Sequence, residues 1–223
     1  MIKKISAILF GLLAFLGWSV QSQAIEVTVG GSVGQAVFAA SGSEIKPIGT
    51  VKEYGAFQDT ISTVFVEVAL TDVISVGVDY MPGDVSTPTN TNVQSDGGTL
   101  NTQGDNGTHR TNTVGADFQD HTMLYVQAAL PFGGYVKLGA STVDVATKEN
   151  LETGGAYPNV DTTGVHLALG YQMDLDSGIF VRAEVMGSDY DDVSATNSNH
   201  ADISVQITDM IGASASLRIG KTF

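Results

Sequence analysis

The sequence contains no cysteine among its 223 residues, and only 5 prolines and a single tryptophan. Without cysteine there is no disulfide framework, no thiolate metal site and no lipid-modified N-terminal cysteine. Basic residues are also scarce, because 10 Lys and Arg stand against 24 Asp and Glu, for a net charge of −14. Such an acidic chain has little with which to neutralise phosphates, so we expect no nucleic-acid partner.

Long apolar runs are confined to the first residues. Lys3 and Lys4 precede the apolar stretch Ile5–Val20, and Ser22-Gln23-Ala24 has the small-x-small form of a cleavage site. This pattern predicts a signal peptide over residues 1–24, cleaved between Ala24 and Ile25, and a mature domain over residues 25–223. The alternative is a buried N-terminal helix. The rest of the chain offers no run of 18 apolar residues, which excludes a helical membrane protein.

Beyond this leader the dominant period is two, and helical periodicity is absent. Eight segments place apolar residues at every second position, with small or polar residues between them. They are residues 27–37, 63–70, 74–80, 122–130, 136–142, 165–173, 179–187 and 203–223. The pattern predicts an all-β protein.

The connections between these segments alternate in length. Short turns are expected at 71–72, 131–133 and 174–178, and long polar loops at 40–59, 82–120, 144–162 and 189–202. Strict alternation indicates two different sides, which is typical of a membrane barrel. We therefore predict an eight-stranded antiparallel up-and-down transmembrane β-barrel, in which the eighth strand closes on the first. A soluble secreted β-sandwich is the alternative fold.

The height of the first charges on the apolar face provides a second argument. Counted from the short-turn side, the first charged or amide residues are Gln35, Asp144, Asp189 and Asp209. Each lies roughly ten to fourteen residues along its strand, and a spanning strand needs ~9–11 residues. Only Lys221 interrupts the charge-free band of these strands.

The opposite face of the strands is polar or small. It carries charged and hydrogen-bonding residues, namely Glu67, Lys137, His166, Gln172, Arg182, Glu184 and Arg218. The interior of an eight-stranded barrel is just wide enough to be filled by side chains. We therefore predict a polar network of ion pairs and hydrogen bonds in the lumen. The alternatives are the solvated face of a sandwich and a narrow channel for small solutes or ions.

Nothing in the sequence predicts an enzyme, and we expect neither a cofactor nor a structural metal. The four histidines, His109, His121, His166 and His200, follow no catalytic or metal-binding motif. A hydrolase at the barrel rim that uses His121 or His200 remains a second alternative. The stretch Asp174–Gly178 lacks the later ligands of a calcium loop and is predicted to be a tight turn.

The four long loops contain sixteen acidic and four basic residues. Solubility and repulsion of neighbours explain this charge. The alternative is loose binding of divalent cations that bridge to anionic lipopolysaccharide.

The leader, the eight segments, the loop alternation and the closing sequence LRIGKTF together resemble the small eight-stranded outer-membrane barrels of Gram-negative bacteria. This group includes the opacity-type surface proteins and the membrane domain of outer membrane protein A. The resemblance implies a C-terminal assembly signal made of Ala215, Leu217, Ile219 and Phe223. Lys221 departs from it, because an aromatic or apolar residue is common there.

The resemblance also implies location and partners. The protein is expected in the outer membrane, with both termini periplasmic, as a monomer in contact with lipid and lipopolysaccharide. Periplasmic chaperones and the outer-membrane assembly machinery would recognise it. Tyr80, Phe132, Tyr171 and Phe223 are the candidates for the membrane interfaces. We expect a structural or surface-interaction role through the acidic extracellular loops; the alternatives are a narrow porin-like channel and the rim hydrolase.

Overall fold

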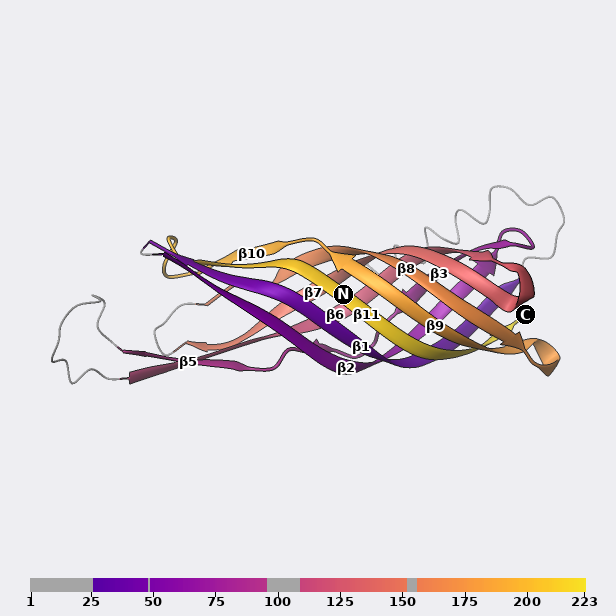
Figure 1. Ribbon diagram of the computed structural model, residues 1–223, viewed down its shortest axis with the longest axis horizontal. Helices are drawn as coiled ribbons and strands as arrows, with labels where there is room; N and C mark the ends of the chain where they lie inside the picture. Colours follow the sequence, from indigo (N-terminus) through magenta and orange to yellow (C-terminus); the bar gives the residue numbers. More distant parts are fainter. Residues whose placement is uncertain (1–25, 48, 96–108, 152–155) are drawn as a thin grey trace.

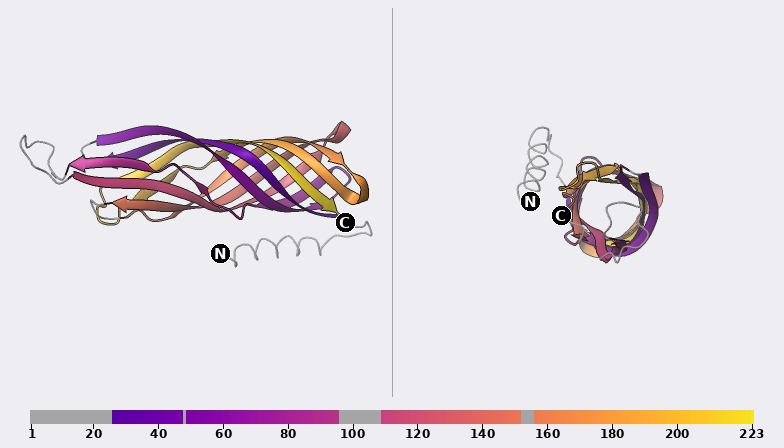
Figure 2. Two further views of the ribbon diagram at one scale, coloured as in Figure 1. Left: turned by 90° about the horizontal axis from the view of Figure 1, so that it is seen from below. Right: turned by 90° about the vertical axis from the view of Figure 1, so that its left-hand side faces the viewer.

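The computed structural model describes residues 26–47, 49–95, 109–151 and 156–223. Eight long strands form a closed ring in the order β1-β2-β3-β6-β7-β8-β9-β11, and β1 also pairs with β11. They are β1 (Val27–Lys46), β2 (Gly49–Ala69), β3 (Ile74–Tyr80), β6 (His109–Ala129), β7 (Gly134–Leu151), β8 (Val160–Asp174), β9 (Ile179–Tyr190) and β11 (Ser204–Thr222). Figure 1 shows them tilted along one axis, and the end-on view in Figure 2 shows the ring. The expected eight-stranded up-and-down barrel is confirmed.

The first and last strands close the barrel. They pair antiparallel from Thr28 opposite Thr222 to Ile45 opposite Ser204. At the end of this seam the Phe223 amide donates to the Val27 carbonyl oxygen at 2.9 Å. Closure matters because an unpaired strand edge would leave backbone groups without partners in a bilayer.

Two of the short connections are tight turns with positive backbone φ angles. Phe132 (φ 64°) and Gly133 (φ 84°) form the turn between β6 and β7, and the Gly134 amide donates to the Pro131 carbonyl oxygen. Ser177 (φ 65°) and Gly178 repeat this geometry between β8 and β9. Two successive positive φ angles are characteristic of the type I′ turn, whose twist matches that of a β-hairpin. The turn predicted at 174–178 is confirmed.

At the other end, the predicted long loops are wrong in their boundaries. Residues 40–59 are mostly strand, since β1 and β2 continue as a hairpin to Lys46 and Gly49. The region 82–120 contains β4 (Val85–Ser86), β5 (Asn90–Ser95) and the first part of β6, and 189–202 contains β10 (Val193–Thr196). In 144–162, β7 continues to Leu151 and β8 begins at Val160. Alternating hydrophobicity reports contact with lipid, whereas backbone pairing continues into water without it. We call the paired residues within 40–59, 82–120, 144–162 and 189–202 the strand extension.

Two β-bulges lie where the extension begins. The register shifts between Ala39 and Ser41 in the β1–β11 pair, and between Gln119 and Thr122 in β6. Each bulge contains an aspartate in the left-handed region, Asp209 (φ 54°) and Asp120 (φ 51°). Aspartate and asparagine tolerate this conformation better than most residues.

The outer wall of the barrel below the bulges is apolar and exposed. Leu138, Val165, Leu217 and Ile219 each expose 59–64 % of their surface. Soluble proteins rarely expose contiguous apolar surface of this kind, whereas a lipid-facing band requires it. None of the described residues forms a helix long and apolar enough to cross a membrane.

Candidate functional site in the lumen

Six charged side chains meet inside the barrel. Glu67 comes from β2, Asp79 from β3, Lys137 from β7, Arg182 and Glu184 from β9, and Arg218 from β11. None exposes more than 5 % of its surface. We call these six residues the lumen cluster; its three acidic and three basic side chains sum to zero charge. The neutral sum matters because an unpaired charge in such a place would be costly.

One ion pair spans from β2 to β9, which are not neighbours in the ring. Arg182 donates from Nη1 to Glu67 Oε2 at 3.0 Å and from Nη2 to Glu67 Oε1 at 3.1 Å. Such a bidentate ion pair fixes both side chains in one geometry. Arg182 Nε also donates to Gln172 Oε1 at 2.6 Å, which orients the guanidinium further.

The other four charges form a chain across the lumen. Asp79 Oδ2 accepts from Arg218 Nη2 at 2.5 Å, and Arg218 Nη1 donates to Glu184 Oε1 at 3.0 Å. Glu184 Oε2 in turn lies 2.5 Å from Lys137 Nζ. The chain therefore connects β3, β11, β9 and β7, so that the ion pairs link opposite parts of the wall.

Aromatic side chains surround the cluster and add hydrogen bonds and ring contacts to it. The hydroxyl of Tyr125 donates to Glu67 at 3.1 Å, and that of Tyr135 donates to Glu184 at 2.8 Å. The guanidinium of Arg218 lies 4.4 Å from the centre of the Phe65 ring. Lys137 Nζ lies 4.6 Å from the Tyr125 ring centre. These cation–π contacts stabilise charges that have left water.

Each of these rings lies against a glycine on the adjacent strand. Tyr125 is directly opposite Gly77, and Tyr135 is directly opposite Gly170. A Cβ at either glycine would overlap the ring. The absence of a side chain therefore lets the ring fold over the neighbouring strand and fill the lumen; glycines facing Phe65 and Phe180 do the same.

A second polar layer contains His166, which we expected in the polar network of the lumen. Its Nδ1 lies 2.8 Å from Ser188 Oγ and its Nε2 lies 2.7 Å from Ser141 Oγ. The His121 ring packs edge-on against it, with ring centres 5.5 Å apart. His166 is thus inside the lumen, bonded to hydroxyl groups, and no carboxylate bonds it within the described residues.

Sequence reasoning missed Asp79 and the four aromatic rings of the lumen. Asp79 alternates with the apolar residues of its strand, but the sequence gives no sign of its partner Arg218, which lies 139 residues away. The aromatic residues carry a weak signal, a ring opposite a glycine, which becomes visible only once the register is known. Gln172 lies beside Arg182, on the polar side of the strand where it was expected.

The two histidines considered for a rim hydrolase, His121 and His200, lie in different parts of the barrel. His121 lies in the lumen with His166, whereas His200 lies in the connection between β10 and β11. The side chain of His109 is outside the described part. In that part, no three or more His, Asp or Glu side chains are grouped so as to hold a metal ion.

The C-terminal residues lie on the outer wall. Leu217, Ile219 and Phe223 expose 60 %, 59 % and 71 % of their surfaces, and Ala215 is exposed on the same side. Lys221 folds its ammonium over the Phe223 ring, 5.0 Å from the ring centre. The predicted signal peptide, with its expected cleavage site between Ala24 and Ile25, lies outside the described residues.

The arrangement as a whole fills the lumen and ties its walls together. Chemically it is a network in which every carboxylate of the lumen cluster lies within 3.0 Å of a cationic nitrogen. Among the described residues, Arg218 Nε and Lys137 Nζ are buried without a hydrogen-bond partner.

Comparison with known proteins agrees with this architecture. The family model described as outer membrane protein beta-barrel domain matches residues 8–207. Among solved structures, the outer membrane protein OprG of Pseudomonas aeruginosa superposes with a TM-score of 0.50, at 12 % identity over 90 % of this chain and 97 % of that one. The outer membrane protease OmpT of Escherichia coli gives a TM-score of 0.49, at 10 % identity over 92 % and 100 %. No curated protein matches in sequence.

Proposed function

Because the chain belongs to the outer membrane protein beta-barrel domain family, we propose that it is a closed outer-membrane barrel that conducts no ions. Its work is to hold the strand extension rigidly above the membrane for contacts at the cell surface. The lumen is the structural core of this device.

The lumen cluster is the observation that carries the proposal. Its ion pairs cross from β2 to β9 and from β3 to β11, so they occupy the middle of the barrel. Tyr125 and Tyr135 fill the space around them, with each hydroxyl bonded to a carboxylate of the cluster. A water-filled pore would instead leave charged side chains hydrated along the wall.

The strand extension supports a role in contact, because it is bonded like a folded unit. Lys148 Nζ lies 2.5 Å from Asp117 Oδ2, and Ser86 Oγ donates to Asp117 Oδ1 at 2.7 Å. These bonds hold the pKa of Asp117 below its usual value, chiefly through the Lys148 bond and then through Ser86. Near the rim, the Ser198 amide donates to the Ala156 carbonyl oxygen at 2.8 Å. A preordered surface loses less entropy on binding.

The topology suggests how the chain would sit in the membrane. The short turns and both termini would face the periplasm, and the extension would face outward, as in barrels with short periplasmic turns. The barrel would act as a monomer, inserted by the assembly machinery after delivery by periplasmic chaperones. Lipopolysaccharide and loosely bound divalent cations would be the first species to meet its acidic rim.

Conductance in planar lipid bilayers tests the closed lumen. The refolded mature protein should give no discrete current steps, because the buried ion pairs of the lumen cluster lie across the barrel. A variant with Glu67→Ala and Arg182→Ala removes one neutral pair and should give small steps. The matched control is Glu53→Ala, on the extension, which should stay silent. Regular steps from the unmodified protein would favour the narrow channel and overturn the proposal.

A further inference from the structure

In the strand extension, β2 has a backbone partner on one side only. Its residues 64–69 pair with β3, whereas within the described structure residues 49–63 pair with β1 alone. The strands β4 and β5, which follow β3 in the chain, pair with β6 instead. Figure 1 shows the β1–β2 hairpin and β5 ending apart from each other at the rim. We call residues 49–58 of β2 the open edge.

Every second residue of the open edge directs its backbone N–H and C=O away from β1. The Ala69 amide donates to the Glu26 carbonyl oxygen, which precedes β1, and the register between β1 and β2 continues without a bulge. Odd-numbered residues of β2 therefore face β1, and even-numbered residues face the other side. The Thr60 amide agrees with this, because it donates to the Asp59 side chain, at 2.7 Å from Oδ1. The backbone groups that face outward along the open edge belong to Thr50, Lys52, Tyr54, Ala56 and Gln58.

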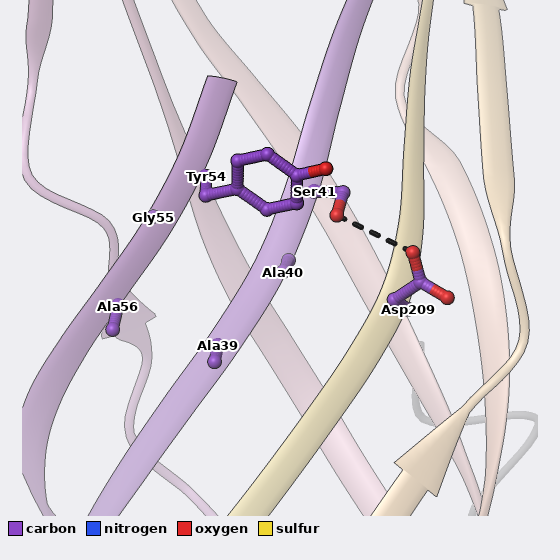
Figure 3. Close-up of a pocket in the computed structure, with 7 residues that line it drawn as sticks. All are labelled: Ala39, Ala40, Ser41, Tyr54, Gly55, Ala56 and Asp209. Carbon is purple, nitrogen blue, oxygen red and sulfur yellow. Dashed lines mark hydrogen bonds between the residues drawn. The ribbon is translucent and has the colours of Figure 1, made fainter. Parts of the chain in front are cut away.

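The open edge is also uncovered by side chains. All residues from Gly49 to Ala56 are exposed, whereas the β1 residues paired with them are half-buried, because β11 pairs on their other side. Figure 3 shows the Tyr54 ring lying toward Ser41 on β1, so the ring does not cover the edge. From the start of β5, Asn90 Nδ2 donates to Glu53 Oε2 at 2.9 Å, which is a side-chain contact and leaves the backbone groups of the edge unpaired.

Most of the devices that block an exposed strand edge are missing here. Natural edges are protected by prolines, bulges, several lysines or inward-pointing charges. The open edge contains no proline and one lysine, Lys52, and no bulge interrupts its pairing with β1. An edge of this kind can accept an extended segment through main-chain hydrogen bonds. The remaining device, the inward-pointing charge, is present and determines which segment fits.

Two carboxylates select the charge of the partner. Glu53 and Asp59 are six positions apart and lie on the same face of β2 as Glu67. Opposite charges directly across a strand pair are stabilising, and like charges are destabilising. A second copy of the chain would bring the same two carboxylates to this face, and each copy has a net charge of −14. The open edge therefore matches a basic strand and repels its own copy.

We propose that the open edge binds an extended peptide segment of another protein, with two basic side chains on one face. The segment adds to the sheet as a strand beside β2, with backbone hydrogen bonds to Tyr54 and Ala56. Its basic side chains meet Glu53 and Asp59, and the ion pair replaces the bond between Asn90 and Glu53. This inference rests on the surface-contact role proposed above and gives the chemical class of the partner.

Binding of a fluorescent peptide to the folded mature protein in uncharged detergent tests the proposal. Antiparallel to β2, the peptide Lys-Thr-Val-Thr-Val-Thr-Lys places one lysine opposite Asp59 and the other opposite Glu53. Fluorescence anisotropy should show saturable binding, and the peptide with glutamate in place of both lysines should not bind. N-methylation at the fourth position, whose N–H faces Ala56, should weaken binding about fivefold, because a hydrogen bond is lost. N-methylation at the fifth position is the matched control, since that N–H faces away from β2.

Variants of the protein test the same edge from the other side. Ala56→Pro removes an N–H that faces away from β1, so the pairing with β1 is kept, as for prolines on natural edge strands. It should abolish peptide binding, whereas the matched variant Ala56→Ser should bind like the unmodified protein. Glu53→Gln should weaken binding about threefold, because one of the two cross-strand ion pairs is lost. Heat-dependent gel migration confirms that only folded barrels are compared.

Four outcomes would overturn the proposal. Equal binding of the two N-methylated peptides, or equal binding by Ala56→Pro and Ala56→Ser, would show that the backbone of the edge is not used. Equal binding of the lysine and glutamate peptides would remove the charge selection. A dimer of the unmodified protein that Ala56→Pro abolishes would assign the edge to a second copy. None of these results bears on conductance, so the closed lumen stands or falls separately.

Discussion

Replacing Glu184 with glutamine should destabilise the barrel more than any conservative change on its surface. Glu184 accepts from Arg218 at 3.0 Å, lies 2.5 Å from Lys137 Nζ and accepts from the Tyr135 hydroxyl at 2.8 Å. Arg218 keeps Asp79 as a partner after the change. Lys137, which is 1 % exposed, loses its bonded carboxylate and is left as a buried cation.

Breaking a buried ion pair on one side costs about 3–5 kcal/mol. We expect a loss of this size in the free energy of unfolding for Glu184→Gln. Adding Lys137→Met removes the stranded ammonium at similar volume, so the double variant should regain about half of the loss. The sign of this coupling is the decisive feature, because independent sites would add their losses.

Urea unfolding in lipid vesicles, followed by circular dichroism and heat-dependent gel migration, measures these differences. The predicted mature chain lacks tryptophan, so tryptophan fluorescence is not the signal of choice. Glu53→Gln is the control, since Glu53 is exposed and bonds only to the Asn90 side chain among the described residues. A loss in the free energy of unfolding below about 1 kcal/mol for Glu184→Gln would refute the reasoning. A double variant less stable than both single variants would also refute it.

Three further predictions concern the closing strand, the lumen glycines and the extension. Deleting Phe223 should lower the amount of assembled barrel in membranes, because the hydrogen bond from its backbone amide to β1 is the last one of the closing seam. Unchanged levels would argue against an assembly role. Gly77→Ala should cost about 1–3 kcal/mol by overpacking, whereas Gly187→Ala, where a Cβ meets nothing within 4 Å, should be nearly neutral; equal losses in urea unfolding would contradict this. The folded pKa of Asp117 lies below its ordinary 3.8, so its bond to Lys148 stabilises the extension above that pH and is lost as the pH falls through the folded pKa. An NMR titration of the Asp117 carboxyl should show this low midpoint, and Lys148→Met should raise it; an unchanged midpoint would contradict the ion pair.

The sequence predicts the membrane part of the fold well, because lipid contact requires an apolar side chain at every second position of a strand. Val165 and Leu217 are apolar for that reason, and both face outward. The strand extension has no such constraint. Residues of the β1–β2 hairpin near Glu53 pair through their backbones. Because their side chains show no apolar alternation, the sequence predicts a loop there.

The lumen was predictable in kind but not in its contacts. Alternation places Glu67 and Arg182 inside the barrel, and closure of eight strands leaves them little room. Which cation meets which anion depends on the stagger between strands, which side-chain type does not encode. His166 illustrates this limit, since its place in the lumen was expected but its hydrogen-bond partners, Ser141 and Ser188, were not.

The neutral lumen cluster has a consequence for the order of events during insertion. Its pairs join β2 to β9 and β3 to β11, which are brought together only when the sheet curls into a ring. In an open sheet Glu67, Asp79 and Arg182 would lack these partners along the face that must become the interior, whereas Glu184 and Arg218 lie on neighbouring strands and could already pair. Partly inserted intermediates should therefore be short-lived, and ring closure should occur together with neutralisation of these charges as a single cooperative step.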